Sequence, residues 1–287
     1  MQIVRTRDAL GAELGGAARP IGLVPTMGAL HAGHVALISA ARAASGTVVV
    51  SIYVNALQFA SGTAVAAYPR NLDADATLAR AAGADILFAP DDASIYPPGE
   101  TRPLVDPGPL AVRLEGASRP GHFAGVVTVV TILFDLVAPD AAWFGEKDAQ
   151  QLRVVEALAT RRGGPAIRRV PTVRDADGLA LSSRNVHLSP AGRVTARAIP
   201  RALQAASNAH AAGAATAGEI RAAALDELRT SPALALDYLD LADGTTLAPI
   251  ADDQPPTAAR SGELLISIAA VVDGVRLIDA CTLSVAK

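Results

Sequence analysis

A segment with two histidines and two glycines lies where a predicted strand gives way to a predicted helix. It reads PTMGALHAGH and spans residues 25–34. Glycines let the backbone approach a phosphate chain, and a helix N-terminus offers free N–H groups and the positive end of the helix dipole. Residues three apart face the same way on a helix, so His31 and His34 could both donate to phosphate oxygens while an α-phosphate is attacked. A metal-binding pair and two helix-capping histidines are the alternatives.

The single internal lysine is a second candidate. Of the 25 basic residues, 23 are Arg, and the two lysines are Lys147 and the terminal Lys287. Lys147 lies in GEKDAQQ, between a predicted strand and a predicted helix. It supplies a compact positive charge for phosphate oxygens, and Asp148 can accept from ribose hydroxyls or cap the helix. The alternative is an ordinary solvated surface charge.

A polar cluster, Ser182-Ser183-Arg184-Asn185, follows in a loop that reads RDADGLALSSRN. Two hydroxyls and a guanidinium can clamp a triphosphate, and a loop can bring them in after the nucleotide binds. The alternative is a polar turn without function.

These segments need a scaffold that aligns strand ends. From residue 20 to about 172, short apolar runs alternate with segments of helix length, which is typical of βαβ units around a parallel sheet. The predicted strands are residues 21–26, 47–54, 86–89, 141–144 and 167–171. The predicted helices are residues 34–44, 71–82, 125–137 and 148–161; we assign 125–137 as helix, despite its β-branched residues, because Pro120-Gly121 precedes it and Pro139 closes it.

The composition changes after about residue 188. Residues 190–212 and 217–229 are alanine-rich and predicted to be helical, and residues 235–242, 263–272 and 275–283 are predicted strands. The pair Asp273-Gly274 between the last two is a strong hairpin signal. Residues 251–262 are predicted to form an exposed loop. A smaller α+β domain with an antiparallel sheet therefore follows the α/β domain.

Composition limits the function. The 287 residues suffice for about two domains, and 51% hydrophobic against 18% charged residues excludes disorder. A net charge of −3 gives no support to nucleic-acid binding, and no stretch is apolar for long enough to predict a membrane span or a signal peptide. One cysteine, Cys281, excludes an internal disulfide and favours a reducing, cytoplasmic location.

The motifs resemble those of a known family. HAGH is similar to the HxGH signature of the nucleotidyltransferase superfamily, which includes class I aminoacyl-tRNA synthetases. PTMGALHAGH, SIYVNALQF, YPRNLDADATL, IYPPG, LEGASRPGHFAGVVTVV, WFGEKDAQQL, TVRDADGLALSSRN and RLIDA occur in the order and spacing of the pantothenate synthetase (pantoate-β-alanine ligase) family. The resemblance covers most of the chain. It implies a Rossmann-like domain at residues 1–173 that binds nucleotide and pantoate, and a smaller α+β lid domain at 174–287.

The family's activity is the ATP-dependent condensation of (R)-pantoate with β-alanine to pantothenate, AMP and pyrophosphate, through pantoyl adenylate. The resemblance therefore implies ATP, Mg²⁺ held mainly by ATP and water, and a homodimer, with His34, His31 and Lys147 as catalytic residues. The residues it implies for ATP binding are Met27, Gly28, Ala29, Leu30, His31, Ala32, Gly33, His34, Gly145, Glu146, Lys147, Asp148, Val173, Leu181, Ser182, Ser183 and Arg184.

Amide side chains are expected to hold pantoate. Asn55 and Gln58 follow the strand at 47–54, at the same sheet edge as the histidines, and uncharged amides suit a hydroxy acid that is held but not protonated. The resemblance implies pantoate contacts for Gln58 and for Gln151, whereas Asn55 alone could be a turn former. Arg119 and His122 are further candidates for lining the site.

The chain departs from the family pattern at Ala56, where Pro is usual, at Ala149, where Phe is usual, and in residues 60–67, which lack the usual acidic residues. These departures bear on the rigidity of the loop and on packing behind the site. Two other functions are weighed against the ligase. A nucleotide-binding regulatory protein is disfavoured by the intact His31, His34, Lys147 and Arg184, and a tRNA-charging enzyme by the missing anticodon-binding domain.

Overall fold

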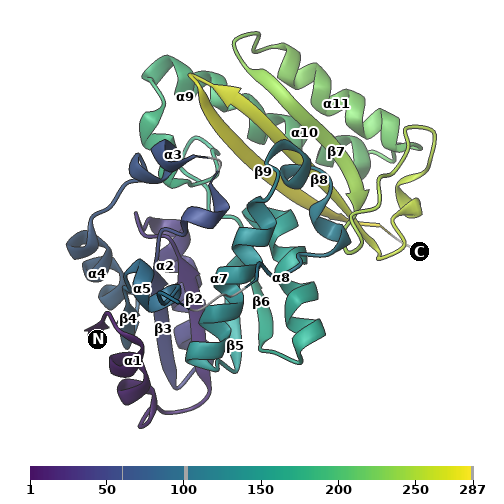
Figure 1. The fold of residues 1–287 in the computed structure, drawn as a ribbon. Helices are drawn as coiled ribbons and strands as arrows, with labels where there is room; N and C mark the ends of the chain where they lie inside the picture. Colours follow the sequence, from purple (N-terminus) through teal and green to yellow (C-terminus); the bar gives the residue numbers. More distant parts are fainter. Residues whose placement is uncertain (60, 100–102, 286–287) are drawn as a thin grey trace. The chain divides into compact units, whose positions relative to one another are not determined.

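The computed structural model describes residues 1–59, 61–99 and 103–285. The chain forms two compact units. Unit 1 comprises Met1–Gly145 and Val154–Pro171, and unit 2 comprises Glu146–Arg153 and Thr172–Lys287 (Figure 1). This division assigns Glu146–Arg153 to the same unit as the C-terminal part of the chain, whereas the prediction divides the chain at one position, after residue 173.

Unit 1 is built on a parallel sheet of six strands in the order β1-β4-β3-β2-β5-β6. The strands are β1 (Gln2–Val4), β2 (Ile21–Thr26), β3 (Thr47–Ile52), β4 (Ile86–Phe88), β5 (Ala141–Gly145) and β6 (Ala166–Val170). The five predicted strands are confirmed, and β1 was missed because three residues carry no periodicity. The strand order reverses between β2 and β5, and the crevice at such a switch point is where parallel α/β sheets bind ligands.

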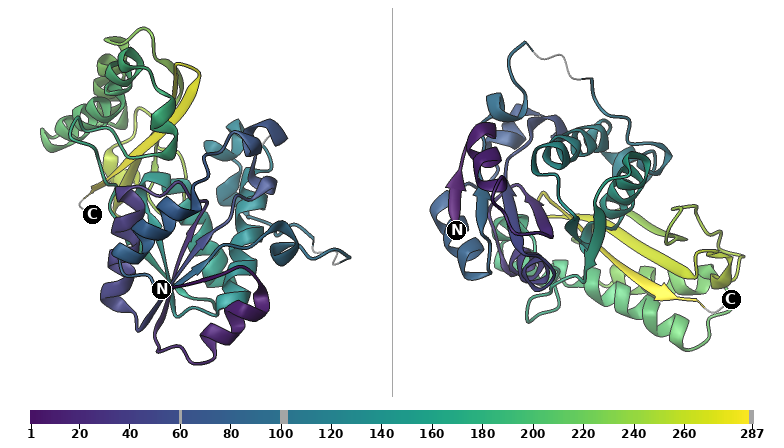
Figure 2. Two further views of the ribbon diagram at one scale, coloured as in Figure 1. Left: turned by 90° about the vertical axis from the view of Figure 1, so that its left-hand side faces the viewer. Right: turned by 90° about the horizontal axis from the view of Figure 1, so that it is seen from below.

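Helices cover both faces of this sheet (Figure 2). The helices up to residue 162 are α1 (Arg7–Leu14), α2 (Ala32–Ala44), α3 (Gly62–Ala66), α4 (Leu72–Ala81), α5 (Asp92–Ile95), α6 (Glu115–Ser118), α7 (His122–Val137) and α8 (Ala149–Arg162), and the 3₁₀ turns are η1 (Ala56–Gln58), η2 (Pro109–Ala111) and η3 (Glu146–Asp148), of which η3 belongs to unit 2. Val24, Val48 and Val50 pack with α2 and α4. The alternate residues Leu23 and Val49 point to the other face and are also fully buried.

The helix α7 confirms the prediction for residues 125–137 and begins three residues earlier. It follows Gly121, which has a positive φ of 81°, and it ends at Val137, before Ala138, which is also left-handed. Nearly all of its side chains are buried, as expected for a helix that is apolar all round.

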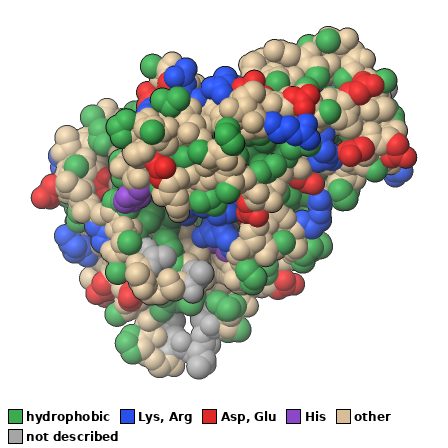
Figure 3. Space-filling model, turned by 90° about the horizontal axis from the view of Figure 1, so that it is seen from above, with side chains coloured by type: hydrophobic (Ala, Val, Ile, Leu, Met, Phe, Trp, Pro, Cys, Tyr) green, Lys and Arg blue, Asp and Glu red, His purple; other side chains and the backbone are tan. Residues whose placement is uncertain are grey.

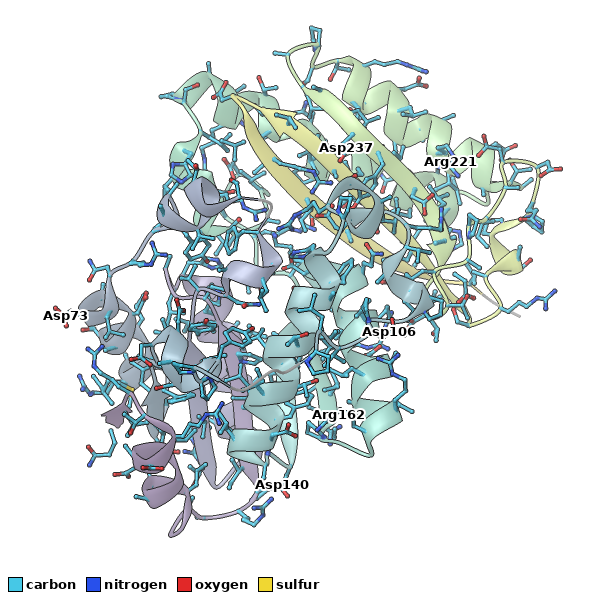
Figure 4. The ribbon with its side chains drawn as sticks, in the orientation of Figure 1. Asp73, Asp106, Asp140, Arg162, Arg221 and Asp237 are labelled. Atoms are coloured by element: carbon cyan, nitrogen blue, oxygen red, sulfur yellow. The ribbon has the colours of Figure 1, made fainter. Side chains whose placement is uncertain are left out.

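One clamp fixes the amino-terminal end of the sheet. Asp140, at the start of β5, accepts hydrogen bonds from the Ile21 amide of β2 (2.6 Å) and from the Arg19 guanidinium (2.8 Å). The bond from Arg19 lowers the pKa of Asp140. Figure 4 shows Asp140 at the end of the sheet opposite the carboxyl ends of the strands. This clamp is structural.

Unit 2 holds an antiparallel sheet, β7 (Ala235–Asp243), β8 (Glu263–Val272) and β9 (Val275–Ser284), as predicted. Its helices are α9 (Pro190–Ala196), α10 (Ala198–Ala211) and α11 (Ala217–Arg229), with 3₁₀ turns η4 (Ser183–His187) and η5 (Pro256–Ala258). The single helical stretch predicted for 190–212 is wrong: the helix breaks at Arg197. The cause is Pro200, which has no N–H for the Ala196 carbonyl and fits only in the first turn of a new helix.

The β8–β9 turn also holds the start of α9. Asp273 and Gly274 have φ of 52° and 74°, as a tight hairpin turn requires. The Asp273 carboxylate accepts from the Ser189 amide (2.9 Å) and hydroxyl (2.7 Å), and the Ser189 oxygen caps α9 by accepting from the Gly192 amide (2.9 Å). The hairpin turn is therefore part of the helix cap.

Among the described residues, none of the helices has the length and apolar character of a membrane span. Acidic and basic side chains are interspersed on the face in Figure 3.

Candidate active site

The loop after β2 is held by the side chains of Thr26, at the end of β2, and of Asp75, on α4. The Thr26 hydroxyl donates to the Ser51 carbonyl of β3 (2.7 Å) and accepts from the Gly28 amide (3.2 Å). Gly28 and Ala29 are both left-handed, with φ of 84° and 51°. A Cβ on Gly28 would also lie 3.0 Å from Asp75 and Ile52, so glycine is required there.

Asp75 of α4 supports this loop through two hydrogen bonds to its backbone. It is 3% exposed, and its carboxylate accepts from the amides of Ala29 (3.0 Å) and Leu30 (2.7 Å). Sequence reasoning missed it. The available signal was an acid on the same helix face as Leu72 and Ala79, where an apolar residue is expected. A cavity of about 300 Å³ adjoins the loop and is lined in part by Met27, Gly28 and Asp75.

His31 and His34 cap the helix α2 reciprocally. The Nδ1 atom of His31 accepts from the Gly33 amide (3.1 Å), and Nδ1 of His34 accepts from the His31 amide (3.3 Å). The capping alternative is thus confirmed. The expectation of free N–H groups at this helix start is wrong for His31, Gly33, Ala29 and Leu30, because protein acceptors already take their hydrogens.

Capping fixes the chemistry of the two rings. A nitrogen that accepts a hydrogen bond carries no proton, so each neutral imidazole holds its proton at Nε2 and acts there as a donor. The ring centroids are 4.2 Å apart, which allows both Nε2–H groups to serve one ligand. A Cβ on Gly33 would lie 2.9 Å from the His31 ring, so this glycine makes room for the histidine.

Asn55 caps η1 and Gln58 ends it, shortly after β3. Asn55 is 1% exposed, and its Nδ2 donates to the Gly125 carbonyl of α7 (3.0 Å) and to Oε1 of Gln58 (3.1 Å). A Cβ on Gly125 would collide with the Leu57 carbonyl, so Gly125 lets η1 lie against α7. Asn55 therefore contacts Gln58, which was predicted to hold the substrate.

Arg119 and His122 hold the backbone of the same turn. The Gln58 carbonyl oxygen lies 2.9 Å from Nδ1 of His122 and accepts from the Arg119 guanidinium at 3.2 Å. Glu115, which is 5% exposed, lies 3.7 Å from Arg119. These residues support η1. Ala56 begins η1 where the family usually has Pro. Of the predicted loop 60–67, Ala60 lies outside the described residues and Gly62–Ala66 form α3.

Lys147 lies on η3, which follows β5 in the chain and packs beside β9 in unit 2. Its side chain is 17% exposed, and Nζ is 3.8 Å from the Asp148 carboxylate, whose side chain is 44% exposed. Gln151 lies partly exposed in the first turn of α8, near Ala149, which begins that helix.

The turn η4, with Ser183 and Arg184, also packs beside β9, so unit 2 places both predicted cationic segments on one strand. Ser182 caps η4 by accepting from the Arg184 amide (3.3 Å), and the Leu181 amide donates to the Val173 carbonyl (3.0 Å). Arg174 forms a double hydrogen bond to Asp279 of β9 (2.6 and 3.1 Å), which anchors the base of this loop.

No three His, Cys, Asp or Glu side chains within the described ranges lie close enough together to hold a metal ion. Burial raises the pKa of the Cys281 thiol to about 11, which does not suit a nucleophile.

Known proteins resemble this chain over nearly its whole length. The family of pantoate-beta-alanine ligases matches residues 2–282. Pantothenate synthetase of Rhizorhabdus wittichii is 49% identical, with 97% of each chain covered. A pantothenate synthetase structure from Thermus thermophilus has a TM-score of 0.90 and 44% identity, covering 98% of this chain and 99% of its own. A pantoate-beta-alanine ligase structure from Francisella tularensis, complexed with beta-gamma ATP and beta-alanine, has a TM-score of 0.78 and 30% identity, covering 98% and 97%. From the match over nearly its whole length, the chain belongs to the pantoate-β-alanine ligase family.

Proposed function

We propose that this protein joins (R)-pantoate to β-alanine at the expense of ATP, releasing AMP and pyrophosphate. The observation that carries the proposal is the family match over residues 2–282. The Francisella relative, complexed with an ATP ligand and β-alanine, supports the same substrates. Two donor imidazoles beside the switch point of the sheet support phosphate chemistry at this place.

In the first step a pantoate carboxylate oxygen attacks the α-phosphorus, and the bond to the bridging oxygen of pyrophosphate breaks. The Nε2–H groups of His31 and His34 donate to the phosphate oxygens as charge develops there. The cations Lys147 and Arg184, with the Ser182 and Ser183 hydroxyls, neutralise the phosphates. The proposed ATP contacts are completed by residues 27–34, apart from the backbone N–H groups that Asp75 and the two histidines already accept from, and by the segment 145–148, Val173 and Leu181.

In the second step the amine of β-alanine attacks the acyl carbon of pantoyl adenylate, the bond to the AMP oxygen breaks, and the amine proton passes to solvent. Neither step needs a covalent enzyme nucleophile, so positioning supplies much of the rate enhancement. Gln58 and Gln151 hold pantoate. Asn55, whose amide already bonds within the protein, orients Gln58.

Three assignments complete the proposal. Mg²⁺ would arrive with ATP and be held mainly by the nucleotide and water, so we assign it no protein ligand. The protein works in the reducing cytoplasm, which its lone Cys281 supports. It acts as a homodimer, as its family resemblance implies; light scattering of the purified protein tests this.

The decisive experiment measures AMP formation with pantoate, β-alanine and ATP together and with each omitted in turn. Labelled pyrophosphate should exchange into ATP when pantoate is present and β-alanine absent. The Gln151→Ala variant should weaken this exchange by roughly 5- to 100-fold through lost hydrogen bonds to pantoate.

Each contrary result has a distinct meaning. Exchange that requires β-alanine contradicts the stepwise mechanism, and exchange without pantoate contradicts the assigned acyl site. Binding of ATP without pyrophosphate release points to a regulatory protein, and AMP release that depends on tRNA points to a tRNA-charging enzyme.

A further inference from the structure

Tyr96, which follows α5, reaches the turn that carries Gln58. Its hydroxyl donates to Oδ1 of Asn55 at 2.8 Å. Asn55 is 1% exposed and Tyr96 is partly buried. Burial, with a smaller contribution from the Asp92 charge, raises the pKa of Tyr96 to about 12, so the hydroxyl keeps its proton at neutral pH.

The orientation of the Asn55 amide follows from its partners. The Gly125 carbonyl can only accept, so the atom 3.0 Å from it is Nδ2, and Oδ1 faces the Tyr96 hydroxyl. The other hydrogen of Nδ2 goes to Oε1 of Gln58 at 3.1 Å. The Nε2 end of Gln58 therefore points away from Asn55, and it lies 2.9 Å from the Met27 sulfur.

We propose that Tyr96 is a positioning residue for pantoate recognition, which acts through Asn55 to fix which end of the Gln58 amide faces the substrate. The inference rests on the proposed role of Gln58 in holding pantoate. With Nε2 outward, Gln58 offers a donor to the oxygens of a hydroxy acid. A flipped amide would present Oε1 to the pantoate carboxylate, where two acceptors repel.

We call the chain of hydrogen bonds Tyr96–Asn55–Gln58 the relay. Of the two hydrogen bonds that Oδ1 of Asn55 accepts, the one from the Tyr96 hydroxyl is the shorter. Without the Tyr96 hydroxyl, Oδ1 of Asn55 still accepts from the Leu57 amide, but this N···O distance of 3.4 Å is at the limit of a hydrogen bond. A buried acceptor left poorly satisfied favours rotation of the amide, and rotation removes the donor from Gln58.

The chain contains a matched control. Tyr53 lies beside Tyr96 with ring centroids 6.3 Å apart, it is 7% exposed, and its hydroxyl donates at 2.8 Å. Its acceptor is Asp92, not Asn55. Tyr53→Phe thus removes a comparable hydroxyl from the same packing environment but leaves the Asn55–Gln58 relay intact.

The test compares Tyr96→Phe, Tyr53→Phe, Gln58→Ala and the double variant Tyr96→Phe/Gln58→Ala, with melting temperatures for all. Tyr96→Phe should raise the pantoate KM by about 5- to 10-fold, the loss of one oriented hydrogen bond, with the ATP KM unchanged. Tyr53→Phe should leave both KM values unchanged. In the Gln58→Ala background, Tyr96→Phe should have no further effect on the pantoate KM.

The outcomes separate the two hypotheses. If Gln58→Ala raises the pantoate KM but Tyr96→Phe does not, the relay is wrong and the assignment of Gln58 stands. Additive effects in the double variant show that Tyr96 acts by another route, and equal rises for ATP and pantoate show a general loss of structure; both overturn the relay. If Gln58→Ala leaves the pantoate KM unchanged, the assignment of Gln58 fails and the relay fails with it.

Discussion

Asp75 and Leu30 are 45 positions apart, yet the Asp75 carboxylate accepts from the Leu30 amide at 2.7 Å. The same carboxylate accepts from the Ala29 amide. One buried side chain on α4 thus determines the path of the loop between β2 and His31. The placement of the histidines therefore depends on a side chain from another helix.

We therefore expect Asp75→Asn to reduce single-turnover adenylate formation by about 10-fold or more, since small displacements of catalytic groups are costly. The variant should also lower the melting temperature, because one of the two backbone N–H groups would then face the amide NH₂, which cannot accept a hydrogen bond. The control is Asp73→Asn on the same helix, whose side chain is exposed and points away from the sheet in Figure 4. Normal adenylation by the Asp75 variant would show that the loop keeps its path without this support.

Substitution of His34 can separate helix capping from phosphate chemistry. Gln at the third helical position is a normal capping-box residue, so His34→Gln should retain the cap and the melting temperature while losing the imidazole donor. His34→Ala should lose both. Each variant should form pantoyl adenylate on the order of 10²-fold more slowly. Near-normal single-turnover adenylation by folded His34→Gln would remove His34 from the mechanism.

Lys147→Arg should slow pyrophosphate exchange by about 10-fold or more, because a planar guanidinium is bulkier than an ammonium and shifts the phosphates. The Lys147 side chain is only 17% exposed, which leaves little room for the change. An unchanged melting temperature provides the control for folding. An Arg variant with parental exchange would identify Lys147 as a generic surface charge.

The ionisation of Asp243 should make the free energy of unfolding of unit 2 depend on pH. Burial would raise the pKa of this carboxyl, but bonds from the Thr246, Ser261 and Thr245 amides outweigh burial and lower the pKa to about 2. Its contribution is therefore complete above the unfolded value of about 3.9 and is lost as pH falls toward about 2.

The variant Asp243→Asn should lose roughly 1–3 kcal/mol of stability at pH 7, measured by urea denaturation. The difference from the parent should shrink when the pH is lowered from 4 to 2, because the protonated carboxyl then resembles the amide. A difference that does not vary with pH would contradict the ionised state of Asp243.

Local patterns were sufficient to predict most of the fold. The run Thr47–Ile52 is β-branched and became a central strand, and the Asp273-Gly274 pair became the hairpin turn. The break at Arg197 also had a local signal in Pro200, which the alanine-rich composition obscured. These features depend on residues within one turn or one strand of each other, so the sequence displays them.

The support of the site could not be predicted in the same way. Asp75 bonds to residues 45 and 46 positions away, and Tyr96 bonds to Asn55 across 41. Such pairs are created by the order of the strands, which periodicity does not reveal. The sequence therefore indicated the residues that could do chemistry, and the structure adds those that hold them in place.

The contact between Asp273 and Ser189 has a consequence for how unit 2 assembles. The hairpin β8–β9 joins neighbouring segments through a two-residue turn, and such hairpins form within microseconds. A seven-residue helix such as α9 is too short to persist alone, and the serine that caps it is held by Asp273. We therefore expect unit 2 to fold from its C-terminal hairpin back toward α9, against the direction in which the ribosome makes the chain.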